Sequence, residues 1–127
     1  MCMADGSDRA DVWLEWKPRA RKDHKCDECG RLIAKGETYR QTKALYEGSW
    51  LALKQCAHCV VLADWLVAEC GGYLTQGIVA DFGEHAQEYS RFDLTRMRWG
   101  AENQWRRKGA LLPVPQMPPT SERRATL

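Results

Sequence analysis

The alternation of apolar and polar positions between residues 37 and 56 predicts a β-hairpin. The stretches ETYRQTKAL (37–45) and SWLALKQ (49–55) are rich in residues that favour strands, and the sequence YEGS joins them, with Gly48 placed for a turn. We expect two antiparallel strands connected by a tight turn.

Apolar residues spaced three and four positions apart predict two helices after the hairpin. The segment AHCVVLADWLVAEC (57–70) is apolar on most sides, which is typical of a largely buried helix, and the glycines at 71 and 72 provide a C-terminal stop. The segment GIVADFGEHAQEY (77–89) repeats this spacing, although Gly83 weakens the prediction. Its inward positions are Ile78, Phe82, Ala86 and Tyr89.

A third helix is predicted from residue 93 to about residue 108. Asp93 is a suitable N-cap residue, and the KG sequence at 108 and 109 is a suitable end. The expected inward positions are Leu94, Met97, Ala101 and Trp105. The order of a hairpin followed by three helices predicts a small α+β protein.

Composition is that of an ordinary globular protein. The chain has 127 residues, of which 44% are hydrophobic and 28% charged, and its formal net charge of +2 is too small to indicate a nucleic-acid-binding protein by itself. The N-terminus lacks the basic and apolar regions of a signal peptide, and no apolar stretch approaches the length of a membrane span. We therefore expect a cytoplasmic protein whose thiols stay reduced.

Four of the six cysteines form two C-x-x-C pairs, Cys26 with Cys29 and Cys56 with Cys59. Zinc prefers four soft or borderline ligands in a tetrahedron, and two such pairs supply them with little backbone strain. Gly30 allows a turn after the first pair, and the second pair lies at a predicted helix start, where the helix dipole favours thiolates. The 26 intervening residues accommodate the hairpin. We predict one Zn²⁺ per chain.

The second pair and the histidines near the pairs also allow other roles. The CAHC sequence resembles the redox motif of thioredoxin-like proteins, but no strand–helix–strand pattern precedes it and the first pair would then have no task. His24 lies two residues before Cys26 and is an alternative ligand. His58 lies between two cysteines and is expected to be exposed at the helix start.

These elements predict one domain with flexible ends. We expect a disordered N-terminus over residues 1–10 and a single zinc-binding domain over residues 11–110. A zinc unit (24–70) and a helical part (73–109) make up this domain. Residues 111–127 hold four of the five prolines and are expected to form a disordered tail.

The knuckle CDECGRLIAKGETY, the hairpin and the helix that carries the last two cysteines together resemble a treble-clef zinc finger. This knuckle, CGGYL, GIVADFGEHAQEY and WRRKGALLPVP also resemble a group of small bacteriophage and prophage proteins, over most of residues 20–115. That resemblance implies a phage origin and a setting in the host cytoplasm, and it implies no reaction.

Charge is segregated along the chain. Residues 55–90 carry five acids and no lysine or arginine, which favours a basic protein partner for Glu84 and Glu88. Residues 91–108 carry six bases against two acids, so this stretch could bind phosphates while a tryptophan stacks on bases. The alternative is a solvated helix face. The candidate nucleic-acid contacts are Arg96, Arg98, Trp99, Arg106, Arg107 and Lys108.

The sequence is compatible with three functions. The favoured one is a non-catalytic, zinc-stabilised binding protein, a phage accessory factor that binds a host protein such as a defence or transcription component; weak nucleic-acid binding is an alternative. An HNH-like nuclease is disfavoured, because the hairpin has no histidine or asparagine and His85 is expected on an exposed polar helix face. The third is a structural or assembly protein of the virion. The sequence leaves the oligomeric state open.

Overall fold

The computed structural model describes residues 10–73 and 76–120, and it confirms the predicted hairpin. Strand β4 (Tyr39–Tyr46) pairs antiparallel with β5 (Ser49–Cys56). Glu47 and Gly48 connect them with φ angles of 48° and 83°, as a two-residue hairpin turn requires. The long hairpin carries the chain from the first cysteine pair to the second.

A third strand, β1 (Val12–Trp16), extends this sheet and was not predicted from the sequence. It pairs antiparallel with β4, so the strand order is β1-β4-β5. Its partner lies more than twenty residues away and no turn signal connects the two, so local pattern could not reveal the pairing. Two short strands, β2 (His24–Lys25) and β3 (Leu32–Ile33), form a separate small sheet around the first cysteine pair.

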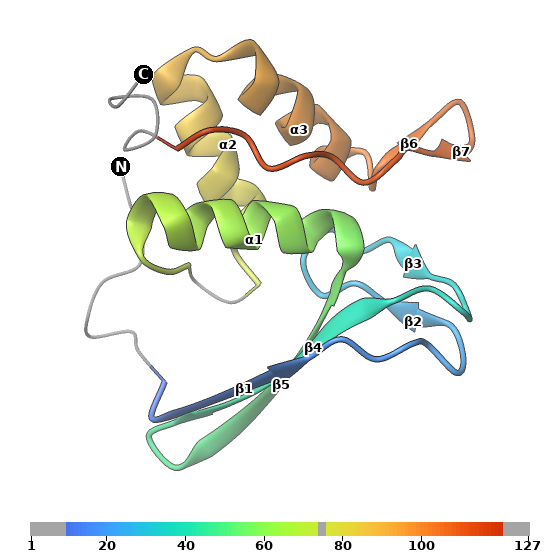
Figure 1. The fold of residues 1–127 in the computed structure, drawn as a ribbon, viewed down its shortest axis with the longest axis vertical. Helices are drawn as coiled ribbons and strands as arrows, with labels where there is room; N and C mark the ends of the chain where they lie inside the picture. Colours follow the sequence, from blue (N-terminus) through green and yellow to red (C-terminus); the bar gives the residue numbers. More distant parts are fainter. Residues whose placement is uncertain (1–9, 74–75, 121–127) are drawn as a thin grey trace.

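Helix α1 (Ala57–Cys70) follows β5 directly and packs on one side of the sheet (Figure 1). The helix ends as predicted, because Gly71 adopts the left-handed conformation and donates its N–H to Val67 O. Arg40 of β4 forms an ion pair with Asp64 of α1, at 2.8 Å, which fixes helix to sheet. Leu62, Trp65 and Leu66 are fully buried at the centre of the molecule.

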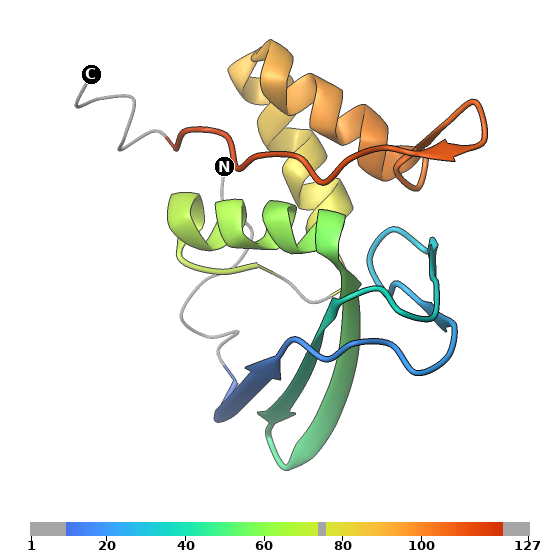
Figure 2. The same ribbon diagram turned by 45° about the vertical axis from the view of Figure 1, so that its right-hand side comes forward.

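Helices α2 (Ile78–Tyr89) and α3 (Phe92–Glu102) form a further layer on the other side of α1 (Figures 1 and 2). Helix α2 is confirmed, with Ile78, Phe82 and Ala86 buried as expected. Because α1 lies between the sheet and the two other helices, it is buried on both sides, which explains its apolar character all round.

The predicted third helix is wrong at its C-terminal end. Helix α3 begins at Phe92 with Asp93 in its first turn, and it ends at Glu102 instead of residue 108. Gln104 and Trp105 have φ angles of 55° and 60°, and a right-handed helix cannot continue through residues in this conformation. The chain then forms a small hairpin, β6 (Arg106–Arg107) with β7 (Ala110–Leu111).

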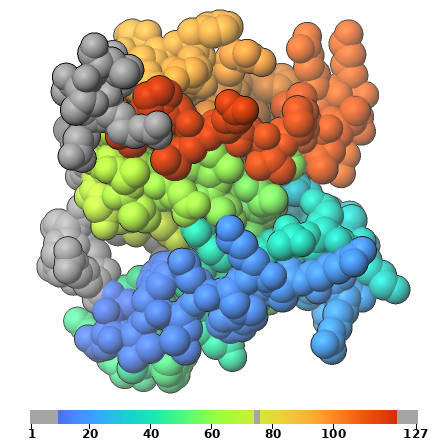
Figure 3. Space-filling model, in the orientation of Figure 1, coloured from blue at the N-terminus to red at the C-terminus, as the bar shows by residue number. Residues whose placement is uncertain are grey.

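The segment after β7 differs from the predicted disorder over residues 111–120. It runs extended across the face between α1 and α3, in both ribbon views and in the space-filling view (Figures 1–3). Pro119 O accepts hydrogen bonds from Trp65 Nε1, at 3.4 Å, and from Arg91 Nη1, at 2.8 Å, and Thr120 is 3% exposed. The rest of the predicted tail, and nearly all of the predicted disordered N-terminus, lie outside the described residues.

Among the described residues, no helix combines the length and apolar character needed to cross a membrane.

Candidate metal centre

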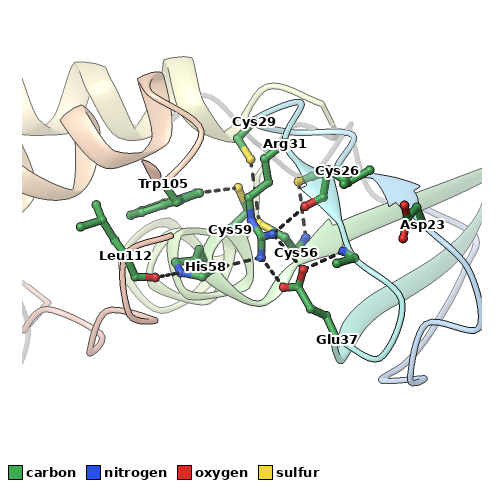
Figure 4. A network of polar contacts seen from close by, with 12 residues as sticks. Asp23, Cys26, Cys29, Arg31, Glu37, Cys56, His58, Cys59, Trp105 and Leu112 are labelled. Atoms are coloured by element: carbon green, nitrogen blue, oxygen red, sulfur yellow. Dashed lines mark hydrogen bonds and ion pairs between the residues drawn. The ribbon is translucent and has the colours of Figure 1, made fainter. Parts of the chain in front are cut away.

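The first cysteine pair lies in a tight knuckle between β2 and β3. Cys26 N–H donates to Arg31 O at 2.9 Å, and Gly30 N–H donates to Cys26 O at 3.0 Å. Gly30 has a φ of 81°, a conformation that an L-residue rarely adopts. The chain therefore reverses over Cys29, so that both sulfur atoms face the same point (Figure 4).

The second pair lies where strand β5 becomes helix α1. Cys56 is the last residue of β5 and the N-cap of α1, and Cys59 lies in the first helical turn. Cys56 N–H points at Cys26 Sγ, 3.4 Å away, which ties this helix start to the knuckle. The predicted side-by-side placement of two pairs from opposite ends of the hairpin is confirmed.

All four sulfur atoms lie within 4.8 Å of one another, and Cys29 Sγ is 3.9 Å from Cys56 Sγ. A tetrahedral zinc ion with Zn–S bonds of about 2.3 Å needs S···S separations of about 3.8 Å. These sulfurs are far beyond the disulfide bond length of about 2.05 Å. Cys26, Cys56 and Cys59 are at most 1% exposed, and Cys29 is half-buried. The cluster therefore fits a metal ion such as zinc.

A buried arginine balances the charge of this cluster. Arg31 is 1% exposed and forms an ion pair with Glu37, with Nη2 2.8 Å from Oε1. Burial disfavours its charge, but the Glu37 carboxylate and the nearby Cys56 sulfur together hold the pKa of Arg31 above its usual range. Hydrogen bonds from the neighbouring thiols lower the pKa of Cys56. Four thiolates around one divalent cation, together with the Glu37 carboxylate, carry three net negative charges, and Arg31 offsets one of them.

His58 is buried, which corrects the predicted exposure at the helix start. It is 2% exposed, and its Nε2 lies 2.6 Å from Leu112 O. Because that carbonyl only accepts, Nε2 carries the proton and Nδ1 accepts from Arg31 Nη2, at 3.3 Å. Both ring nitrogens are therefore engaged, and His58 links the extended C-terminal segment to the arginine beside the cysteines (Figure 4).

Trp105 contacts the cluster from the C-terminal part of the chain, and sequence reasoning assigned it only to the core. Its Nε1–H points at Cys59 Sγ, 3.5 Å away, and its ring lies 5.3 Å from the His58 ring. It is 2% exposed, so its predicted burial is confirmed although it lies outside α3. An N–H donor to a ligand sulfur stabilises thiolate charge. The helical spacing that predicted the burial of Trp105 gave no indication of its contact with Cys59.

His24 is not part of the cluster that the structure brings together. Among the described residues, the group of metal-ligating side chains is the four cysteines alone. His24 lies in β2, where its ring is 5.2 Å from the ring of Tyr39. The alternative ligand expected from its place in the sequence is therefore not supported.

The basic residues predicted to bind nucleic acid do not lie along one helix. Trp99 is exposed as expected, at 47%. Arg96 stacks on the Phe92 ring, whereas Arg98 forms an ion pair with Glu102 at 2.7 Å. The other three members, Arg106, Arg107 and Lys108, belong to the β6–β7 hairpin. Glu84 and Glu88 are exposed one turn apart on α2.

His85 is buried, which corrects the predicted exposed polar face. It is fully buried on α2, where its Nδ1 lies 2.9 Å from Asp81 O and 3.4 Å from Asp81 Oδ1. Its Nε2 lies 3.3 Å from Cys70 Sγ. The Asp81 carboxyl is also fully buried, neither of its oxygens has a hydrogen-bond partner among the described residues, and burial raises its pKa.

The fold and this site define a small α+β protein with a four-cysteine cluster that could hold a metal ion such as zinc. No protein-family model matches the chain, and the comparisons with curated proteins and with solved structures found no match.

Proposed function

We propose that this is a non-catalytic binding protein whose four cysteines hold one structural Zn²⁺. The observation that carries the proposal is the donor set: four sulfurs lie within 4.8 Å of one another, and four such ligands would fill the tetrahedral positions of a zinc ion without leaving one for water or substrate. Three of the four cysteines are buried in the core, Cys29 packs against it, and Trp105 donates to Cys59, which together support a role in folding.

The order of elements around the cluster resembles that of a treble clef, which supports this part of the proposal. A knuckle supplies the first two ligands, the β4–β5 hairpin follows, and the start of α1 supplies the last two. Together with the sequence motifs that resemble phage proteins, this supports a phage accessory factor acting in the host cytoplasm.

The surroundings of His58 and His85 favour this function over an HNH-like nuclease. Such a nuclease needs a general-base histidine that can reach a substrate. His58 and His85 are both buried with their ring nitrogens engaged, and the β4–β5 hairpin contains no histidine.

A host protein is the partner that we favour for the side formed by α2 and α3. Phe92 is 77% and Trp99 47% exposed, at positions seven residues apart on one face of α3. Exposed aromatic side chains are favoured at protein interfaces. Acidic side chains on α2 and basic ones on α3 give this side mixed charge, which suits a protein surface better than a uniform polyanion.

The metal is tested by native mass spectrometry of protein purified without added zinc. We expect one zinc per chain. Cys56→Ser should lose the metal and unfold at a lower temperature, whereas the matched Ala57→Ser variant, one residue further on, should keep both. A folded chain without metal, whose four cysteine thiols all react freely, would refute the structural zinc.

The partner is tested by affinity purification from host lysate with and without nuclease, followed by titration of the purified candidate. We expect a host protein that survives nuclease treatment. The double variant Glu84→Lys/Glu88→Lys should weaken its binding without loss of zinc, and Glu47→Lys at the hairpin turn serves as a charge control. An unchanged Kd for the double variant would remove α2 from the interface.

A further inference from the structure

The side of the sheet that faces away from α1 carries a regular array of nine side chains. The strand register places them in three rows across β1, β4 and β5. The rows are Val12–Leu45–Trp50, Leu14–Lys43–Ala52 and Trp16–Gln41–Lys54. We call these nine residues the outer sheet face. No described helix covers it (Figures 1 and 2).

Tryptophans occupy two opposite corners of the outer sheet face and are exposed to solvent. Trp50 is 59% and Trp16 45% exposed, and Leu14 is 50% exposed. By contrast, Leu53 of β5 and Ala44 of β4, which point to α1, are at most 1% exposed. The core of the protein is therefore complete without these tryptophans.

Every formal charge on the outer sheet face is positive. Lys43 lies at its centre and Lys54 at one corner, and neither forms an ion pair with a described residue. Asp27 contacts the backbone of Lys54, because one of its carboxylate oxygens accepts the Lys54 backbone N–H at 2.7 Å. The face thus combines aromatic surface with unpaired cations.

Basic side chains continue from the row of Trp16 into the segment that follows β1. The acid within that segment, Asp23, accepts the Lys35 N–H at 2.9 Å. The exposed basic residues are Lys17, Arg19, Arg21 and Lys22. A bound polyanion with one negative charge per monomer would therefore meet cations along the segment that follows β1.

The size of the outer sheet face limits what it can bind by itself. Strands about 4.8 Å apart, with same-side residues about 6.7 Å apart, place Trp16 and Trp50 about 16 Å from each other. The face then measures roughly 300 Å², well below the about 800 Å² that each partner contributes to a standard protein interface. It matches the two or three bases that other exposed sheets stack on their aromatic residues.

We propose that the outer sheet face binds single-stranded nucleic acid. Trp16 and Trp50 stack on two bases, Lys43 at the centre contacts a phosphate between them, and Lys54 at a third corner contacts a phosphate beside them. Stacking is tolerant of sequence because every base offers a π-face, so this site binds without strong sequence preference. The proposal gives a ligand to the binding protein proposed above and uses a different surface from α2 and α3.

The test measures fluorescence anisotropy of labelled single strands of about 15 nucleotides, oligothymidylate and oligouridylate, with the zinc-loaded full chain at several salt concentrations. Trp16→Ala and Trp50→Ala should each weaken binding about 5- to 150-fold, as expected for the loss of one stacked base. Lys43→Gln and Lys54→Gln should each flatten the slope of log K against log salt by about 0.7.

Trp13→Ala is the matched control, because Trp13 lies on the same strand but points to the α1 side, with its ring 6.1 Å from that of Tyr73. It should bind like the unaltered chain. Zinc content and unfolding temperature are measured for every variant, so that a loss of fold is separated from a loss of contact.

Several results would overturn the proposal while leaving the structural zinc intact. These are absence of binding at low salt, equal affinity for a duplex of the same length, or unchanged affinity in Trp16→Ala and Trp50→Ala. A loss confined to Trp99→Ala would move the site to α3. Loss of a purified protein partner in Trp50→Ala, with no effect on oligonucleotides, would make the face a protein interface.

Discussion

Replacing Gly100 with alanine tests whether the chain holds Trp105 against the metal centre as tightly as the structure indicates. A Cβ atom at Gly100 would lie 2.6 Å from both Cε3 and Cζ3 of the Trp105 ring. The ring cannot move aside easily, because it is buried and its own backbone N–H donates to Gly100 O at 2.6 Å. Gly100→Ala must therefore displace the indole from Cys59.

Two opposing effects set the size of this change. Overpacking a buried site destabilises the fold by about 1–3 kcal/mol. Exchanging glycine for alanine inside a helix stabilises it by about 0.5–1 kcal/mol. We expect Gly100→Ala to lower the free energy of unfolding by about 1–2 kcal/mol. Because the indole N–H of Trp105 then no longer donates to the Cys59 thiolate, zinc should also transfer faster to a competing chelator.

Gly83 provides the matched control within α2. A Cβ there would meet Arg98 Nε at 3.3 Å, and that side chain is flexible and 40% exposed. Gly83→Ala should therefore be neutral or stabilising, by up to about 1 kcal/mol. The free energies of unfolding of both variants are compared by urea titration with saturating zinc, monitored by circular dichroism. If Gly100→Ala is as stable as Gly83→Ala, the close packing of Trp105 is wrong.

Three further predictions concern buried charge and the C-terminal segment. Burial raises the pKa of Asp81, so ionisation of its carboxyl lowers the stability of the fold as pH rises above the usual pKa of 3.8. Asp81→Asn should therefore raise the free energy of unfolding by about 1 kcal/mol near neutral pH, and by less in acid, as measured by urea titration. Arg31→Met should cost about 2 kcal/mol in thermal unfolding and speed zinc release, because the charge beside Cys56 is then unbalanced. Ending the chain after Leu111 should lower the unfolding temperature relative to ending it after Thr120.

The parts of the molecule that the sequence predicted correctly carry their signals locally. The β4–β5 hairpin has alternating strand formers around a turn with Gly48, and α1 has a continuous apolar period that stops at Gly71. The four cysteines were found because spacing within each pair, and the hairpin between the pairs, are both readable in the chain. These features need no knowledge of distant contacts.

The parts that the sequence could not predict depend on partners far along the chain. His58 is buried because Arg31 and Leu112 contact it, and Leu112 is 54 residues away. Residues 111–120 look like a proline-rich tail, yet an extended chain without internal hydrogen bonds can be held by a few carbonyl contacts to α1 and α3. The early end of α3 follows from the left-handed backbone at Trp105. The sequence does not reveal this conformation, because Trp105 continues the helical spacing of apolar residues.

The layering of the fold explains why a surface remains for binding. Helix α1 is buried on both sides, by the sheet and by α2 with α3, so no helix among the described residues is left to cover the other side of the sheet (Figure 1). Exposed strand positions can be filled by threonine at little cost in stability. Tryptophan at positions 16 and 50 therefore contributes little to folding and leaves two large rings in water beside Lys43 and Lys54. A binding role accounts for these side chains, whereas the metal centre and the core do not require them.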